Sequence, residues 1–201
     1  MRYSVQHKAK THERVLKKAA EQMCRRGVEG TGIASLMGKV GLTHGGFYAH
    51  FPDKNALIAE ATGPMLEEGV AEVIAAAEAA PEGKKVRAIV NTYLSTAHRD
   101  SPQTCPVAGL AGEMARQSKT VRNAYTGAIE ERLKLIARFL SGANEQERRD
   151  RARLMMSGMA ASMMIARVIT NCKASDQFLE QAREFYASAF EATPTQKDKK
   201  S

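Results

Sequence analysis

Hydrophobic positions along most of the chain recur every three or four residues, the interval that places side chains on one face of an α-helix. Turn residues such as those at 81–83 separate the segments that carry this pattern. The predicted helical segments are 11–26, 31–51 (two short helices), 53–80, 84–99, 104–118, 120–140, 145–172 and 175–192. Tryptophan is absent, and strong helix formers outnumber β-branched residues. The pattern therefore predicts an all-α fold of about nine helices.

Two short helices joined by a tight turn are predicted between Thr31 and Lys54. We expect Thr31 to cap the first helix and Thr43 to cap the second, because short hydroxyl side chains accept hydrogen bonds from free N–H groups. Gly41 is expected to end the first helix in the left-handed conformation that glycine adopts without steric cost. Pro52 is expected to end the second helix.

The second of these helices has an unusual outer face. Phe47 and Phe51 lie four residues apart and form an inner, buried face. The outer face is left with His44, Gly45, Gly46, Tyr48 and His50. Each glycine costs a helix about 1 kcal/mol against alanine, so this composition favours a surface that a large partner approaches closely. An ordinary helical hairpin in a core would explain the two phenylalanines but not the outer face.

A helix-turn-helix places its second helix in the major groove of DNA, and this stretch resembles one. It is similar to the DNA-binding domain of the TetR/AcrR family of bacterial transcriptional regulators over about residues 10–60. The residues that carry the resemblance are Gly27, Thr31, Ile33, Val40, Gly41, the run from Thr43 to Phe51, Lys54 and Leu57. The resemblance implies a homodimeric regulator of palindromic DNA, commonly a repressor, that a small molecule releases from its operator.

DNA contacts follow from this resemblance residue by residue. Base edges or the sugar-phosphate backbone are expected to meet His44, Gly45, Gly46 and Tyr48. Phosphates are expected to be held by Thr43, His50 and Lys54. Asp53 is the expected cap of the next helix, which puts Lys54 in the first turn, where a cation is unfavourable unless an anion binds there too.

Net charge divides unevenly along the chain. Residues 1–54 hold ten Lys or Arg and four Asp or Glu, whereas the remainder hold twenty and eighteen. The first quarter therefore carries most of the formal charge of +8. This asymmetry points to a polyanion-binding N-terminal domain, with the arm at 1–9 able to reach DNA or simply disordered.

The predicted domains are a helix-turn-helix domain at 1–62, a ligand-binding and dimerisation domain at 63–192 and a disordered tail at 193–201. Gly63-Pro64 is expected to kink the helix that joins the two domains. The second half of the predicted 145–172 helix carries methionines and small residues and is apolar on nearly all its faces. It therefore needs packing partners on all sides. The expected dimer-interface residues on the last two helices are Met159, Ser162, Met163, Ala166, Phe178 and Phe185.

A ligand pocket is expected inside the second domain. Its candidate lining residues are Tyr93, His98, Cys105, Met114, Gln117, Tyr125 and Met155. Cys105 precedes Pro106, which suits the first position of a helix, so the thiol lies at or next to an N-cap. Two interpretations stay open: a thiolate favoured by the helix N-terminus that senses electrophiles, or an inert, buried cysteine.

Other classes of protein find little support. No run of about 18 apolar residues indicates a membrane span, no signal peptide is recognisable, and we expect a cytoplasmic protein without a membrane partner. Three scattered cysteines suit neither a disulfide framework nor a zinc site, and no cofactor is expected. No P-loop, nucleophile elbow or dinucleotide fingerprint indicates an enzyme. The alternative is a helical dimeric carrier or enzyme without specific DNA binding, which a gel-shift experiment would distinguish.

Overall fold

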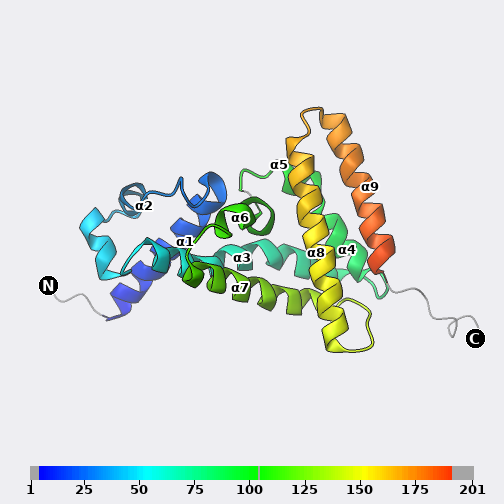
Figure 1. Ribbon diagram of the computed structural model, residues 1–201, viewed down its shortest axis with the longest axis horizontal. Helices are drawn as coiled ribbons and strands as arrows, with labels where there is room; N and C mark the ends of the chain where they lie inside the picture. Colours follow the sequence, from blue (N-terminus) through cyan, green and yellow to red (C-terminus); the bar gives the residue numbers. More distant parts are fainter. Residues whose placement is uncertain (1–4, 104, 192–201) are drawn as a thin grey trace, which may run out of the picture. The chain divides into compact units, whose positions relative to one another are not determined.

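The structure is a computed structural model that describes residues 5–103 and 105–191. Helices connected by turns make up the described residues, which include no strand, and this confirms the predicted fold class (Figure 1). The elements are α1 (Val5–Arg26), α2 (Ile33–Lys39), a 3-10 helix η1 (His44–Ala49), α3 (Lys54–Ala79), α4 (Lys85–Tyr93), α5 (Thr96–Asp100), α6 (Pro106–Met114), α7 (Lys119–Ala137), α8 (Glu145–Val168) and α9 (Cys172–Phe190). No helix in the described part of the chain is long and apolar enough to cross a membrane.

The chain forms two compact units that are discontinuous in sequence. The first unit comprises Met1–Gly69 together with Pro102–Glu131, and the second comprises Val70–Ser101 together with Arg132–Ser201. Helices α3 and α7 each contribute residues to both units. Pro64 lies inside α3, which continues through it rather than ending there. Helix α6 and most of α7 therefore belong with the helix-turn-helix, not with the rest of the C-terminal half.

The core of the first unit draws on α1, α2, η1, α3, α6 and α7. Its fully buried side chains include Val15, Met23, Leu36, Met37, Phe47, Phe51, Leu57, Ile58, Leu66, Leu110, Met114 and Val121. On α1 the buried positions follow the helical interval that the sequence predicts. Burying a phenylalanine or leucine contributes about 1.5–3 kcal/mol, so this cluster supplies the main stabilisation of the unit.

Two predicted helix starts in this unit are wrong. Helix α1 begins at Val5 rather than at residue 11, and Thr11 is buried within it. The predicted arm at 1–9 therefore overlaps the helix, and its first four residues lie outside the described part. Gly32, not Thr31, is the N-cap of α2, and the Thr31 hydroxyl instead donates to the Gly27 carbonyl at 2.9 Å.

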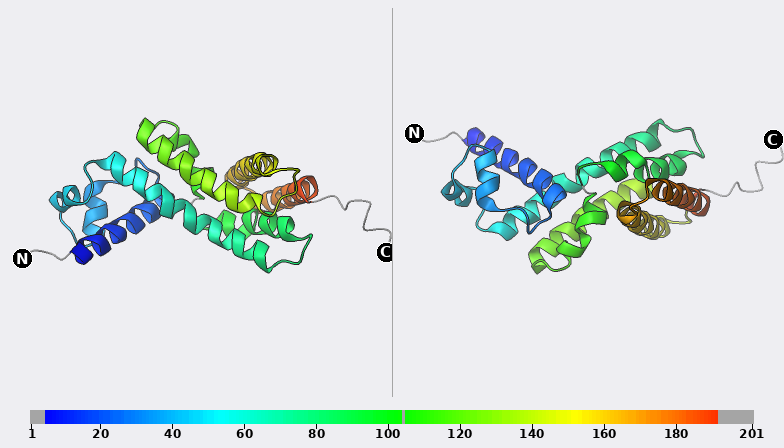
Figure 2. Two further views of the ribbon diagram at one scale, coloured as in Figure 1. Left: turned by 90° about the horizontal axis from the view of Figure 1, so that it is seen from below. Right: turned by 90° about the horizontal axis from the view of Figure 1, so that it is seen from above.

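The second unit is built on α8 and α9, which run side by side, and α4 packs against α9 (Figures 1 and 2). Its fully buried side chains include Ile89, Val90, Leu94, Met155, Met159, Met163 and Leu179. Polar ties reinforce the packing: Arg183 donates to the Leu94 carbonyl at 2.9 Å, and Arg99 donates to the Ser175 hydroxyl at 2.9 Å.

The predicted helix at 84–99 is two helices in the structure. Leu94 is the C-cap of α4, and the Ser95 hydroxyl accepts the N–H of His98 at 3.1 Å to start α5. Serine competes with the backbone for hydrogen bonds and so favours a new cap over helix continuation. The predicted disordered tail at 193–201 lies outside the described residues.

Candidate DNA-binding site

The turn between α2 and η1 is fixed by backbone hydrogen bonds and one arginine. The N–H of Leu42 donates to the Met37 carbonyl at 2.9 Å, and Gly41 has φ +72°. This is the left-handed helix end that the sequence predicts. Arg14 on α1 donates to the Val40 carbonyl at 2.8 Å, which ties the turn to the first helix.

The second helix of the motif is a 3-10 helix of six residues. The Thr43 hydroxyl accepts the N–H of Gly46 at 3.2 Å, which confirms the predicted cap. Phe47 and Phe51 are fully buried, with their rings stacked 5.5 Å apart. A 3-10 helix is tighter than an α-helix and suits short elements, and adjacent glycines lower the stability of the α-helical alternative.

The opposite face of η1 is open. His44 and Gly45 are exposed, and Tyr48 is 59% exposed. The rings of His44 and Tyr48 meet edge to face at 6.0 Å. No atom lies within 4 Å of the position that a Cβ on Gly45 would take. Polar, aromatic and glycine positions thus form a free surface on an element whose other side is anchored in the core.

His50 lies at the edge of this surface and is half-buried. Burial lowers its pKa below the ordinary 6.5, and the positive charges of His12 and Lys8 lower it further. The ring of His12 is 6.0 Å away and stacks on Phe51 at 4.5 Å. The surroundings of His50 therefore favour the neutral imidazole in the free protein.

The start of α3 has the expected cap. Asp53 Oδ1 accepts the N–H of Ala56 at 2.8 Å, and Lys54 is the first residue of the helix. The α3 N-terminus therefore presents a cation and free N–H groups immediately after the motif. This combination suits an anion such as a DNA phosphate.

A comparison with protein families identifies this region. Residues 15–61 match the sequence model of the bacterial regulatory proteins of the tetR family. This stretch of the chain belongs to the TetR family. This match indicates a DNA-binding transcriptional regulator, and η1 occupies the position of the second helix of the helix-turn-helix. No curated protein sequence matches the chain significantly.

Solved structures share the fold over nearly the whole chain. A TetR transcriptional regulator from Chloroflexus aurantiacus is 24% identical with a TM-score of 0.71, covering 94% of this chain and 100% of that one. One from Cytophaga hutchinsonii is 18% identical with a TM-score of 0.72, covering 95% and 100%. The reduced form of NemR from E. coli is 16% identical with a TM-score of 0.73, covering 92% and 100%.

The candidate ligand residues fall in both units. The second unit contains Tyr93, His98 and Met155. Tyr93 and Met155 are buried. The Nδ1 atom of His98 lies 2.6 Å from the carbonyl oxygen of Tyr93, within hydrogen-bond distance. Met114 and Gln117 belong to the first unit. Met114 is buried in its core, whereas the Gln117 amide donates to Glu29 at the surface at 3.3 Å.

Cys105 and Tyr125 both belong to the first unit. Cys105 precedes α6, and Tyr125 on α7 contacts the first turn of α6. Cys105 is the N-cap of α6 and 7% exposed, and Pro106 occupies the start of the helix as predicted. The Tyr125 hydroxyl donates to the Pro106 carbonyl at 2.9 Å. Burial raises the pKa of Tyr125, and the neighbouring thiols of Cys105 and Cys24 raise it further. Tyr125 therefore remains a neutral hydrogen-bond donor that anchors the first turn of α6.

The six candidate dimer residues divide by exposure. Met159, Met163 and Ala166 are buried within the second unit of one chain. Phe185 is 65% exposed, while Ser162 and Phe178 are half-buried. The other exposed large apolar side chains on this pair of helices are Leu154, Met164, Ile165 and Val168, all on α8.

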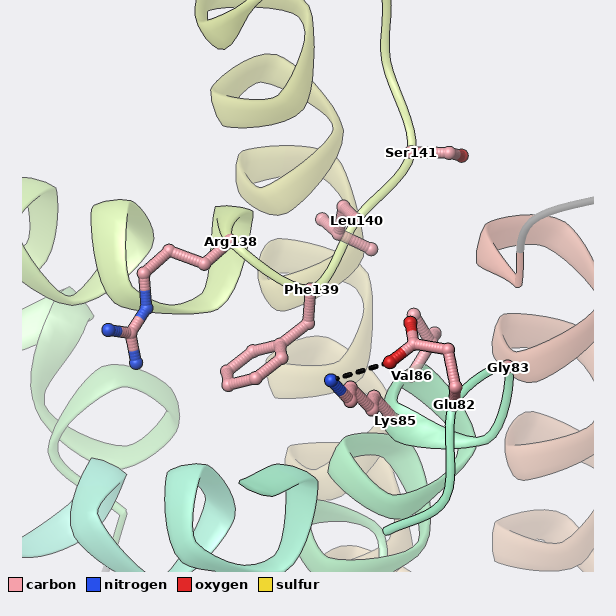
Figure 3. A pocket seen from close by; sticks show the side chains of 8 residues that line it. All are labelled: Glu82, Gly83, Lys85, Val86, Arg138, Phe139, Leu140 and Ser141. Carbon is pink, nitrogen blue, oxygen red and sulfur yellow. Dashed lines mark ion pairs between the residues drawn. The ribbon is translucent and has the colours of Figure 1, made fainter. Parts of the chain in front are cut away.

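One pocket of about 260 Å³ lies in the second unit, beside the turns before α4 and after α7 (Figure 3). Its lining is Glu82, Gly83, Lys85, Val86, Arg138, Phe139, Leu140 and Ser141. None of the candidate ligand residues is among them. Lys85 pairs with Glu82 at 2.8 Å, and Arg138 with Glu78 at 3.3 Å, so both cations are already neutralised. In the described residues no three His, Cys, Asp or Glu side chains gather as metal ligands.

Proposed function

We propose that this TetR-family regulator is a repressor that binds a palindromic operator as a homodimer and is released when a small molecule acts on its C-terminal domain. The observation that carries the DNA-binding part is the two-sided η1: Phe47 and Phe51 are fully buried while Gly45 and Tyr48 face outward. A rigid element with an exposed glycine allows close approach to DNA. His44, Gly45, Gly46 and Tyr48 read the groove, and Thr43, His50 and Lys54 hold phosphates.

The dimer forms through the exposed apolar faces of α8 and α9. The exposed fractions are 70% for Leu154, 75% for Val168, 53% for Ile165 and 65% for Phe185. Two protomers that each supply this pair of helices would form a four-helix bundle and bury the apolar surface from water. Two-fold symmetry would place the two recognition helices about 34–36 Å apart, or a multiple of that, on the palindrome.

The effector acts by favouring one arrangement of the chain over another, since a ligand shifts an equilibrium only by its differential affinity. Tyr93, His98 and Met155 remain the candidates in the second unit, and Met114, Gln117 and Tyr125 in the first. Cys105 offers a covalent route: an α,β-unsaturated carbonyl would add to its sulfur. The buried position of Cys105 supports the inert interpretation, and its N-cap position supports the reactive one.

The experiment combines operator binding with effector screening. Gel shifts on DNA flanking the gene test for a palindromic site, and thermal-shift screening of small hydrophobic compounds supplies candidates that release the DNA. Treatment with a maleimide tests the covalent route, with Cys105→Ser as the control. Equal affinity for all DNA duplexes would contradict the proposal that the protein is a sequence-specific regulator. If the maleimide releases wild type and Cys105→Ser from DNA equally, Cys105 has a purely structural role.

A further inference from the structure

The turn between α1 and α2 is held by a carboxylate from α6. Glu113 Oε2 accepts the N–H of Val28 at 2.7 Å and that of Glu29 at 3.3 Å. Hydrogen bonds that involve a charged acceptor are about twice as strong as neutral ones. These contacts join residues 85 and 84 positions apart in the sequence, and all three residues lie in the first unit.

Gly27 makes room for this carboxylate. It has φ +77°, and a Cβ placed on it would lie 2.5 Å from Glu113 Oε1. A side chain at this position would therefore strain the backbone and also displace the Glu113 carboxylate. The glycine that ends α1 thus serves two purposes, because the left-handed turn exposes consecutive N–H groups to one acceptor.

Both sides of this contact are themselves anchored. On the α6 side, Leu110 and Met114 are buried in the core of the unit on either side of Glu113. On the turn side, Val28 is fully buried and its carbonyl accepts the N–H of Thr31 at 3.2 Å. A shift of α6 is therefore transmitted to the turn rather than absorbed by loose side chains.

The turn leads directly into the helix-turn-helix. Helix α2 begins at Ile33, five residues after Val28, and packs against both α1 and η1. The direction in which the chain leaves the turn consequently sets where α2 and η1 lie on the unit. A small change at Val28 alters the presentation of the recognition helix without touching a DNA-contacting residue.

We propose that Glu113 is a positioning residue for DNA binding: its carboxylate fixes the α1–α2 turn, and operator affinity depends on that bond. This inference rests on the proposed operator binding. Removing the acceptor with Glu113→Leu should weaken operator binding by at least about fivefold, the scale of coupling between linked sites. Base preference and salt dependence should remain unchanged, because no DNA contact is lost.

The test measures operator affinity and amide hydrogen exchange on the full-length protein. In Glu113→Leu the amides of Val28 and Glu29 should exchange faster while amides of the second unit keep their protection. Glu113→Gln retains a carbonyl acceptor and should recover most of the affinity and protection. Glu67→Leu, an exposed glutamate of the same unit on α3, is the matched control and should behave as wild type.

Each failure has a separate meaning. Unchanged operator affinity in Glu113→Leu overturns the proposal, whether or not the turn amides exchange faster. A Gln variant as weak as the Leu variant, with its melting temperature intact, overturns the hydrogen-bond route. If wild type itself does not discriminate an operator from random DNA, the proposed function fails; the exchange measurement then still decides whether Glu113 holds the turn.

Discussion

The hydroxyl of Thr43 accepts the N–H of Gly46 at 3.2 Å, and this bond defines the beginning of the recognition helix. A hydroxyl can accept one hydrogen bond and donate another. Thr43 can therefore cap η1 and donate its proton to a phosphate at the same time. The bond to Gly46 holds the oxygen in place in the free protein, which would favour the proposed phosphate contact.

Gly45→Leu should abolish operator binding without unfolding the protein. The position of its Cβ is open, so the added side chain projects into solvent in the free protein and meets DNA in the complex. Circular dichroism melting and gel shifts measure the two effects. Gly127→Leu, an equally open helical glycine on α7, is the control and should leave both unchanged. A Gly45→Leu protein that still binds its operator would remove Gly45 from the contact surface.

Lys54→Ala should weaken binding to all DNA sequences alike. Because a lysine that neutralises one phosphate releases about one counterion, the slope of log Kd against log salt should become shallower by about one unit. Fluorescence anisotropy across a salt titration measures this. Lys84→Ala, at an exposed position before α4, should keep the wild-type slope. Identical slopes for Lys54→Ala and wild type would exclude the phosphate contact.

Phe185→Glu should convert the proposed dimer to a monomer. It replaces an exposed apolar side chain of α9 by a carboxylate, which would be costly to desolvate without a partner in the proposed interface. Sedimentation velocity at micromolar concentration should show the mass of one chain, and operator affinity should fall with it. Leu135→Glu, at an exposed apolar position on α7, should remain dimeric. A monomeric wild type would rule out this interface.

Stability should fall on acidification through the titration of His50. Its pKa is lower in the folded protein than the ordinary 6.5, so the unfolded chain binds the proton more readily. The stabilisation is present above pH 6.5 and is lost as the pH falls through this value toward the folded pKa. Melting temperatures at pH 7.5 and 5.5 measure the loss, which should be smaller in His50→Gln. An equal loss in both proteins would assign the effect to other groups.

The sequence predicts the helix-turn-helix well because its signals are local. Gly41, Thr43 and Asp53 each act within four residues, and all three have their predicted roles in the structure. The start of α2 was less predictable, since its N-cap Gly32 has no side-chain acceptor that would have indicated it. The predicted DNA and ligand contacts themselves stay predictions.

Glu113 was missed for a different reason. Its partners are backbone N–H groups in a segment far away in the sequence, and the residue types of that segment do not indicate that its N–H groups need a side-chain acceptor. Gly27 was the available signal: a glycine with positive φ exposes consecutive amides, which calls for an acceptor. Which of the chain's many carboxylates supplies it depends on tertiary packing.

The discontinuity of the first unit affects how the protein can be made and divided. Its core includes Leu110, Met114, Val121 and Tyr125, which leave the ribosome long after α3. The DNA-binding region therefore cannot complete its packing during synthesis until most of α7 has emerged. A fragment cut after α3 would leave part of its hydrophobic surface uncovered, so this recognition helix is poorly suited to grafting onto another protein as a short N-terminal module.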